Sequence, residues 1–158
     1  MCFEQGADVI AVARAVAEEN ARAAPVYISG ATGPKAEFIN GYFLPTEEKG
    51  LDGRVMYSKR GDGSMCIEHL RGQWQIKPVS SKGTAACYAS VAGGCPFENC
   101  TSRLWNVLIE NKSTNQLNMK MSTGADAELQ VSGAAACARM MTMPGHFHVA
   151  RLLFESAF

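Results

Sequence analysis

From residue 26 onward the chain consists of short apolar runs separated by glycine-rich turns, and this punctuation limits the folds that it can adopt. The clearest case is the segment 61–64, Gly-Asp-Gly-Ser, which separates the β-type runs 54–59 and 65–70. A short glycine-rich connection between two such runs predicts a hairpin of antiparallel strands. We therefore expect a sheet in which strands that are neighbours in sequence are also neighbours in space.

Further runs rich in β-branched and aromatic residues predict strands at 26–29, 74–79, 86–91 and 104–110. A half-buried strand is expected where Leu117, Met119 and Met121 alternate with polar residues. Large aromatic side chains are natural anchors for the core of a small sheet. The core is therefore expected to contain Tyr57, Trp74 and Trp105.

The N-terminal segment has a different pattern, in which Val9, Val12 and Val16 recur at helical spacing among alanines. This predicts a helix over 8–24 that ends before Pro25. The expected fold class is thus mainly β, an antiparallel β-meander forming a small barrel or sandwich, with an N-terminal α-helix. We divide the chain into this helix (1–25), a β module (26–110) and a C-terminal extension (111–158).

The C-terminal extension leaves two interpretations open. Residues 129–134, Leu-Gln-Val-Ser-Gly-Ala, are similar to residues 26–31, Val-Tyr-Ile-Ser-Gly-Ala, which indicates either a truncated second copy of the module or a chance similarity. A strand is expected at 128–132, and 134–143 fits a helix or a strand.

The end of the extension is strongly apolar. Large exposed apolar patches are rare on soluble monomers, so these residues are expected either to complete the sheet or to contact a partner protein. The partner-binding candidates are Met140, Met141, Met143, Phe147, Leu152, Phe154 and Phe158.

Composition narrows the classes of partner. The formal net charge of the 158-residue chain is zero, whereas proteins that rely on phosphate contacts usually carry a basic excess, so no nucleic acid is expected. No window offers the ~18 apolar residues that a membrane span needs, and acidic residues replace the basic start of a signal peptide. We expect an intracellular protein, cytoplasmic or organellar, with reduced thiols.

One motif suggests an enzyme. Residues 27–36 place Gly30 and Gly33 directly after a predicted strand, as in the phosphate loop of NADP-dependent short-chain reductases. However, Asn40 and Gly41 would interrupt the helix that such a loop requires, and no alternation of strands and helices follows. We interpret the two glycines as parts of a structural turn and predict no cofactor.

Cysteine and histidine provide the other candidate chemistry. Zinc is one option, with ligands drawn from Cys87, Cys95, Cys100, His69, His146 and His148. The spacing lacks the usual Cys-x2-Cys pair, and unmodified thiols are the plainer interpretation. A local disulfide between Cys95 and Cys100 is a third option, if the compartment is oxidising.

Five basic residues lie on neighbouring predicted strands and turns, where they form either a basic patch or solvated strand edges. They are Lys59, Arg60, Arg71, Lys77 and Lys82.

An ordered set of motifs covers residues 26–107. It reads GATG, INGxY, PTxE, GxxxY, KxGD, WxxKP, KG, CPxxxC and W. This order resembles an uncharacterised β-rich module that recurs in algal and other protist proteins. The resemblance implies a small β-meander used as a repeated building block in larger proteins, and it implies no chemistry.

We therefore expect a non-enzymatic binding or scaffold module, or an accessory subunit of a larger assembly, with other protein subunits as partners. The resemblance to protist proteins makes an organellar assembly one version of this hypothesis, and self-association stays open. The alternative is a small enzyme, either NADP-dependent and reductase-like or metal-dependent. Retention of a cofactor on purification would distinguish the two classes.

Overall fold

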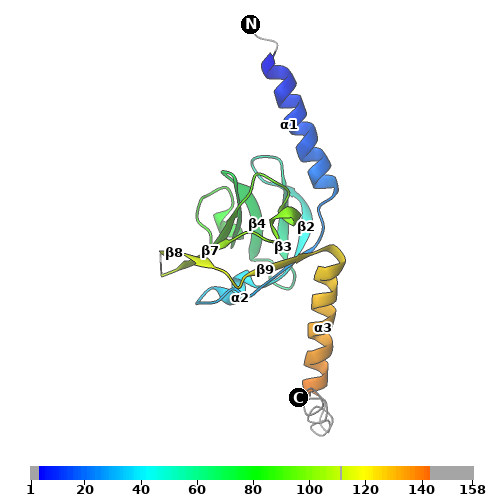
Figure 1. Cartoon of the computed structure of the whole chain (residues 1–158), viewed down its shortest axis with the longest axis vertical. Helices are drawn as coiled ribbons and strands as arrows, with labels where there is room; N and C mark the ends of the chain where they lie inside the picture. Colours follow the sequence, from blue (N-terminus) through cyan, green and yellow to red (C-terminus); the bar gives the residue numbers. More distant parts are fainter. Residues whose placement is uncertain (1–3, 111, 143–158) are drawn as a thin grey trace.

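The computed structural model describes residues 4–110 and 112–142 and has one curled, nine-stranded antiparallel sheet (Figure 1). Its strands are β1 (Val26–Ser29), β2 (Gly41–Lys49), β3 (Val55–Lys59), β4 (Met65–Leu70), β5 (Gln73–Pro78), β6 (Ala89–Ala92), β7 (Trp105–Ile109), β8 (Lys112–Gln116) and β9 (Lys120–Thr123). Their order is β8-β7-β6-β5-β4-β3-β2-β1-β9, so the first eight strands form a meander. The expected mainly β fold is confirmed.

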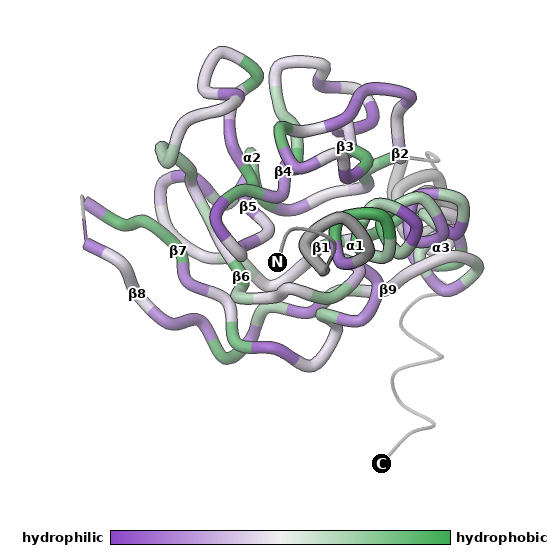
Figure 2. The backbone as a smooth tube through the Cα atoms, turned by 90° about the horizontal axis from the view of Figure 1, so that it is seen from above, coloured by the Kyte–Doolittle hydropathy of each residue, from purple (hydrophilic) through white to green (hydrophobic). Residues whose placement is uncertain are grey.

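The sheet is strongly curled because its two edge strands are consecutive in the chain. Three residues connect β8 to β9, a link that spans at most about 14 Å. The side-chain amide of Gln116 also makes two hydrogen bonds with the backbone of Thr32, at 2.9 and 3.0 Å, across the gap between the edges. Seen from above, the strands wrap around the core as an incompletely closed barrel (Figure 2).

The core is built around aromatic rings. Tyr57, Trp74 and Trp105 are almost completely buried, as expected. Phe97 lies among all three, with ring centroids 5.3, 5.0 and 6.2 Å away respectively. It comes from the short 3-10 helix η2 (Phe97–Cys100), so the connection between β6 and β7 contributes the central residue of the cluster.

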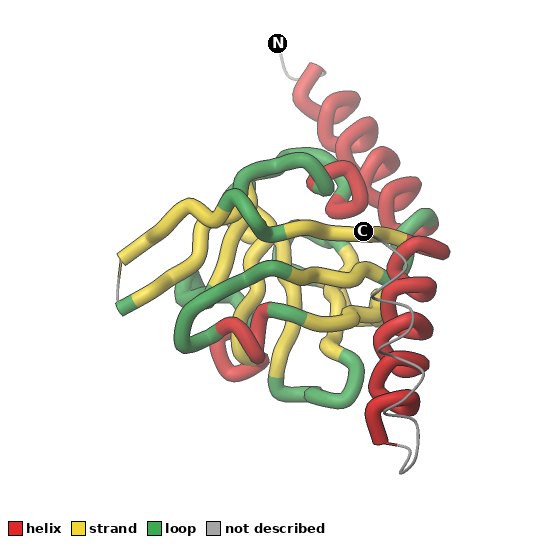
Figure 3. Tube along the Cα trace, turned by 60° about the horizontal axis from the view of Figure 1, so that its bottom comes forward, coloured by secondary structure: helices red, strands yellow, loops and turns green. Residues whose placement is uncertain are grey.

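Three α-helices accompany the sheet: α1 (Glu4–Ala21), α2 (Ala36–Ile39) and α3 (Gly124–Thr142). Helices α1 and α3 leave the sheet in opposite directions (Figure 1), and α3 does so from the edge formed by β1 and β9, which it contacts (Figure 3). The expected N-terminal helix is present, although it ends at Ala21 rather than at Ala24.

The strand expected at 128–132 is wrong, because these residues lie within α3. Alanine-rich sequence favours helix, and buried Ala127 faces the sheet from this helix. Residues 26–31 form β1 and the loop after it, so the two similar hexapeptides adopt different structures. The segment 134–142, left open between helix and strand, is helical.

Two strands were not expected from the sequence. Strand β2 contains Pro45 and three charged residues, and β8 is entirely polar, so neither has the expected apolar alternation. Gly41, expected to interrupt a helix, is the first residue of β2. Strands β8 and β9 belong to the same sheet, so the sheet continues beyond residue 110 to Thr123.

The outer face of the sheet carries a fully buried ion pair. The Nζ of Lys77 donates to the Oε2 of Glu68 at 2.9 Å, and the exposed fractions of the two side chains are 0% and 3%. Lys77 also donates to the carbonyl of Thr84, and the amide of Gly83 donates to Glu68. The pair therefore fixes the connection between β5 and β6 over the sheet. Assigning Lys77 to a basic patch or a solvated strand edge was wrong.

We expect Lys77→Met to lower the free energy of unfolding by about 3–5 kcal/mol, because it leaves a buried carboxylate without its cation. Adding Glu68→Gln to this variant should recover part of the loss, since it removes the buried charge. The control is Lys82→Met, which breaks a partly exposed pair with Glu48 and should cost about 1 kcal/mol or less. Chemical denaturation measures all three, and equal losses for the two lysine variants would contradict this prediction.

Candidate functional site

Helix α1 is attached to the sheet near its C-terminal end. The side-chain amide of Asn20 donates to the carbonyl of Gly53 at 2.9 Å and accepts from the amide of Val55 at 2.7 Å. Glu19 accepts a hydrogen bond from Arg54 at 3.0 Å. By contrast, every side chain from Asp8 to Ala15 is exposed. The helix is therefore held at one end and projects from the sheet with most of its length uncovered.

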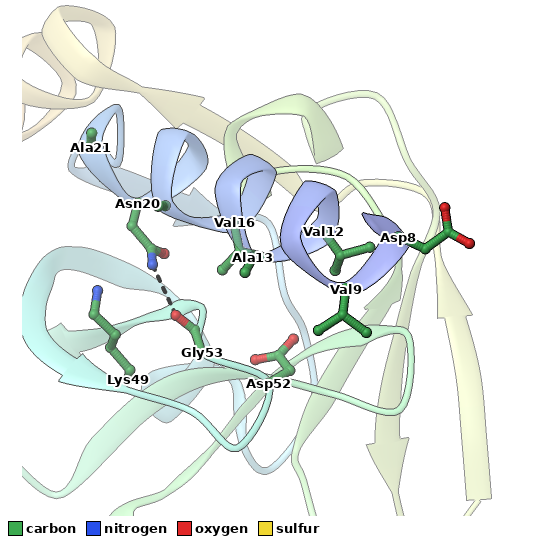
Figure 4. Close-up of a pocket in the computed structure, with 11 residues that line it drawn as sticks. Asp8, Val9, Val12, Ala13, Val16, Asn20, Ala21, Lys49, Asp52 and Gly53 are labelled. Carbon is green, nitrogen blue, oxygen red and sulfur yellow. Dashed lines mark hydrogen bonds between the residues drawn. The ribbon is translucent and has the colours of Figure 1, made fainter. Parts of the chain in front are cut away.

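A groove of about 890 Å³ lies between α1 and the turn that joins β2 to β3. Val9, Val12, Ala13 and Val16 face this turn from the helix (Figure 4). Val9 is 67% exposed and Val12 is 63% exposed, which is high for valine on the apolar side of a helix. The polar residues of the groove are Asp8, Asn20, Lys49 and Asp52. Its lining therefore has an apolar stripe with charged residues around it.

A second groove, of about 540 Å³, lies on the other side of the same helix. Val12 and Val16 line both grooves, so the apolar stripe is accessible from two sides. The opposite wall comes from the sheet side and contains Arg54, Gly94, Pro96, Glu98 and Asn99.

Arg54 connects four parts of the chain beside these grooves. Its guanidinium bonds to Glu19 of α1, to Asp52 of the turn at 2.9 Å and to the carbonyl of Gly94 at 3.2 Å. It also lies 3.1 Å from the Nδ1 of His69 in β4. Only 16% of the Arg54 side chain is exposed, so a nearly buried cation joins the helix to the sheet.

His69 completes this polar cluster. Its Nε2 donates to the carbonyl of Gly93 at 2.9 Å, because a carbonyl can only accept. Its Nδ1 lies between the Asp52 carboxylate, at 2.5 Å, and the Arg54 guanidinium. Burial raises the pKa of Asp52, but the hydrogen bonds from Arg54 and His69 outweigh burial and hold that pKa below its ordinary value.

The segment between β6 and η2 is fixed by side chains from elsewhere in the fold. Four consecutive carbonyls, those of residues 92–95, each accept from a different side chain, in order Arg103, His69, Arg54 and Trp74. Glu98, a little further along, accepts from the hydroxyl of Tyr57 at 2.6 Å and from the amide of Ala24 at 3.1 Å. This connection therefore joins the core to the start of the sheet just after α1.

The two candidate phosphate-loop glycines lie in a packed turn. Both have positive φ, +80° at Gly30 and +95° at Gly33. A Cβ added at Gly30 would lie 2.1 Å from the carbonyl oxygen of Asn118, so the missing side chain makes room for the link between β8 and β9. Helix α2, which follows the turn, has only four residues and ends before Gly41.

The candidate metal ligands are only partly brought together. The Sγ atoms of Cys95 and Cys100 are 3.7 Å apart, whereas the ring nitrogens of His69 contact Asp52, Arg54 and Gly93. Among the side chains that the structure describes, no three of His, Cys, Asp or Glu form a metal-binding group, and Cys87 is a half-buried thiol. His146 and His148 lie outside the described residues.

Most of the partner-binding candidates at the C-terminal end lie outside the residues that the structure describes. Met140 and Met141 belong to α3. Met143, Phe147, Leu152, Phe154 and Phe158 lie outside the described residues. Their role stays a prediction.

Comparison with models of protein families, with curated proteins and with solved structures finds no match for this chain. In the described part of the chain, neither long helix has an apolar stretch of the length needed to cross a membrane. The function is therefore argued from the geometry of the grooves and of the polar cluster.

We expect Asp52 to make the stability of the protein depend on acid pH. Its carboxylate has a lowered pKa in the folded state, so its contribution is present above the ordinary pKa of 3.8 and is lost as the pH falls through the folded-state pKa. Because Asp52 is partly exposed, the contribution should be about 1 kcal/mol or less. Denaturation between about pH 6 and about pH 3 should therefore show a smaller loss for Asp52→Asn than for the natural chain. Equal losses of unfolding free energy in the variant and the natural chain would contradict the role assigned to Asp52.

Proposed function

We propose that this chain is a non-enzymatic protein-binding module that docks an amphipathic helix of a partner protein along α1. The observation that carries this proposal is the exposed valine stripe of α1, which lines a groove on each side of the helix. Helix-in-groove recognition uses such a stripe, with apolar anchors one turn apart on the partner. An accessory subunit of a larger assembly is the narrower form of this proposal.

The stability of α1 supports the same conclusion. Isolated helices of this length are marginal in water, and helices in proteins are stabilised mainly by packing of their apolar face. The side chains of Asp8–Ala15 are exposed, so the sheet supplies little of that packing. A partner that covers Val9 and Val12 would bury apolar surface and complete the packing of the helix.

Charge adds a constraint on the partner. Asp8 and Lys49 lie at the same groove as the valines. A docked helix with an apolar face and oppositely charged residues at its margins would meet both side chains. Such rim charges guide orientation more than they add affinity.

The proposal is tested by placing a photo-crosslinking residue at position 12 of the full chain in the cells that express it. The same residue at position 117 is the control, because Leu117 is 85% exposed and lies away from both grooves. We expect a discrete adduct with a second protein from position 12 only, with the crosslink in a helical segment of that protein. Equal labelling from both positions would contradict the proposal, and an adduct of two copies of this chain would replace the partner by self-association.

A matched pair of variants then measures the interaction. Val12→Asp places a charge in the middle of the stripe and should weaken binding to the crosslinked partner by at least about tenfold. Ala11→Asp introduces the same charge one residue away, outside both grooves, and should change binding little. Equal effects of the two variants would mean that a charge at any position on α1 weakens binding, so that the valine stripe is not the binding surface.

A further inference from the structure

Cys95 and Cys100 bracket a four-residue segment beside helix α1. Their Sγ atoms are in contact at 3.7 Å. Cys100 is completely buried, whereas Cys95 is partly exposed at the margin of the core. Among the thiols of the described residues, this is the one pair in contact with each other.

The surrounding backbone is shaped to accept both sulfurs. A Cβ at Gly93 would lie 2.9 Å from the Sγ of Cys100 and 3.5 Å from that of Cys95. The first distance is too short for any side chain at this position, so a glycine is needed for Cys100 to pack as it does. The carbonyl of Cys95 is fixed by the indole of Trp74 at 3.0 Å, which holds the backbone on the other side of the pair.

We propose that Cys95 and Cys100 are a dithiol site that forms a reversible disulfide by exchange with a small-molecule disulfide such as oxidised glutathione. The Cys95 thiolate attacks one sulfur of the oxidant, the S–S bond of the oxidant breaks, and one glutathione thiolate leaves. Cys100 then loses its proton to solvent and attacks the Sγ of Cys95, which releases the second glutathione. In total, two protein thiols are oxidised and one disulfide is reduced to two thiols.

The order of the two attacks follows from exposure. A small-molecule disulfide can reach Cys95, whereas Cys100 is enclosed and can react only with its neighbour. Burial and the hydrogen bond with Cys95 raise the pKa of Cys100 to about 12. The second step should therefore be slow at neutral pH and become faster as the pH rises.

The disulfide would fix one wall of a groove at α1. Pro96, Glu98 and Asn99 lie between the two cysteines and line the second groove. Glu98 also accepts from the amide of Ala24 in the link between α1 and β1. This site goes beyond the proposed docking function and does not depend on it, because the chemistry requires only the two thiols.

The test uses the full chain with Cys2→Ser and Cys137→Ser, which leaves the four cysteines whose thiols the structure describes. The protein is incubated with oxidised glutathione, alkylated after unfolding and analysed by mass spectrometry. We expect a Cys95–Cys100 disulfide, alkylated Cys66 and Cys87, and a rise of about 4–8 °C in Tm that is reversed by dithiothreitol. Cys66 and Cys87 are internal controls, because neither thiol is in contact with a second thiol of the described residues.

Single variants test the order of attack. Cys100→Ala should stop at a mixed disulfide that carries one glutathione on Cys95, whereas Cys95→Ser should leave Cys100 unmodified. Cys87→Ser should behave like the parent chain, and circular dichroism confirms that each variant is folded. The proposal would be overturned if all four thiols stayed free after incubation. It would also be overturned if Cys66 or Cys87 formed a disulfide as readily as the pair Cys95 and Cys100. Glutathione found on Cys100 in the Cys95→Ser variant would overturn the assigned order.

Discussion

The position of helix α1 depends on the nearly buried guanidinium of Arg54. This group joins Glu19 of the helix, Asp52 of the β2–β3 turn and the carbonyl of Gly94, and it touches His69 of the sheet. Arginine suits this place because its planar group has five N–H donors and stays charged, whereas lysine offers a single point charge. The two grooves along α1 exist because the helix is held at this end and leaves the sheet beyond it.

The curled sheet provides the rigid part to which this cluster is attached. The polar cluster lies next to the aromatic core, since His69 packs edge-on against Trp74 with ring centroids 4.9 Å apart. Tyr57 extends from the same core to Glu98 with its hydroxyl group. Displacing the segment 92–98 would therefore disturb both the core and the attachment of α1. The proposed disulfide would join Cys95 of this segment to Cys100 at the end of η2.

The sequence led to some parts of the candidate site and missed others. The valine stripe and the Cys95–Cys100 pair were visible, because helical spacing and short separations along the chain are local properties. Asp52, Arg54 and Glu98 were missed, since they look like ordinary surface charges and their partners Glu19, His69 and Tyr57 are distant in the chain. A signal was present in the polar residues beside the Gly50–Gly53 and Gly93–Gly94 turns, but nothing in the sequence pairs these turns.

The sequence by itself determined the meander from β3 to β7 and its aromatic core, because hairpin turns, alternation and ring size act between near neighbours. Only the tertiary structure decided between strand and helix for the two similar hexapeptides. Val26 is paired on both sides, with Phe43 and Thr123, whereas residues 129–134 continue a helix that begins at Gly124. The burial of Lys77 and the position of Arg54 were decided in the same way. Arg54 depends on Glu19, His69 and Gly94, which are distant in the chain and meet only in the folded protein. Lys77 depends on nearer partners, because Glu68 of the adjacent strand and the loop after β5 enclose it.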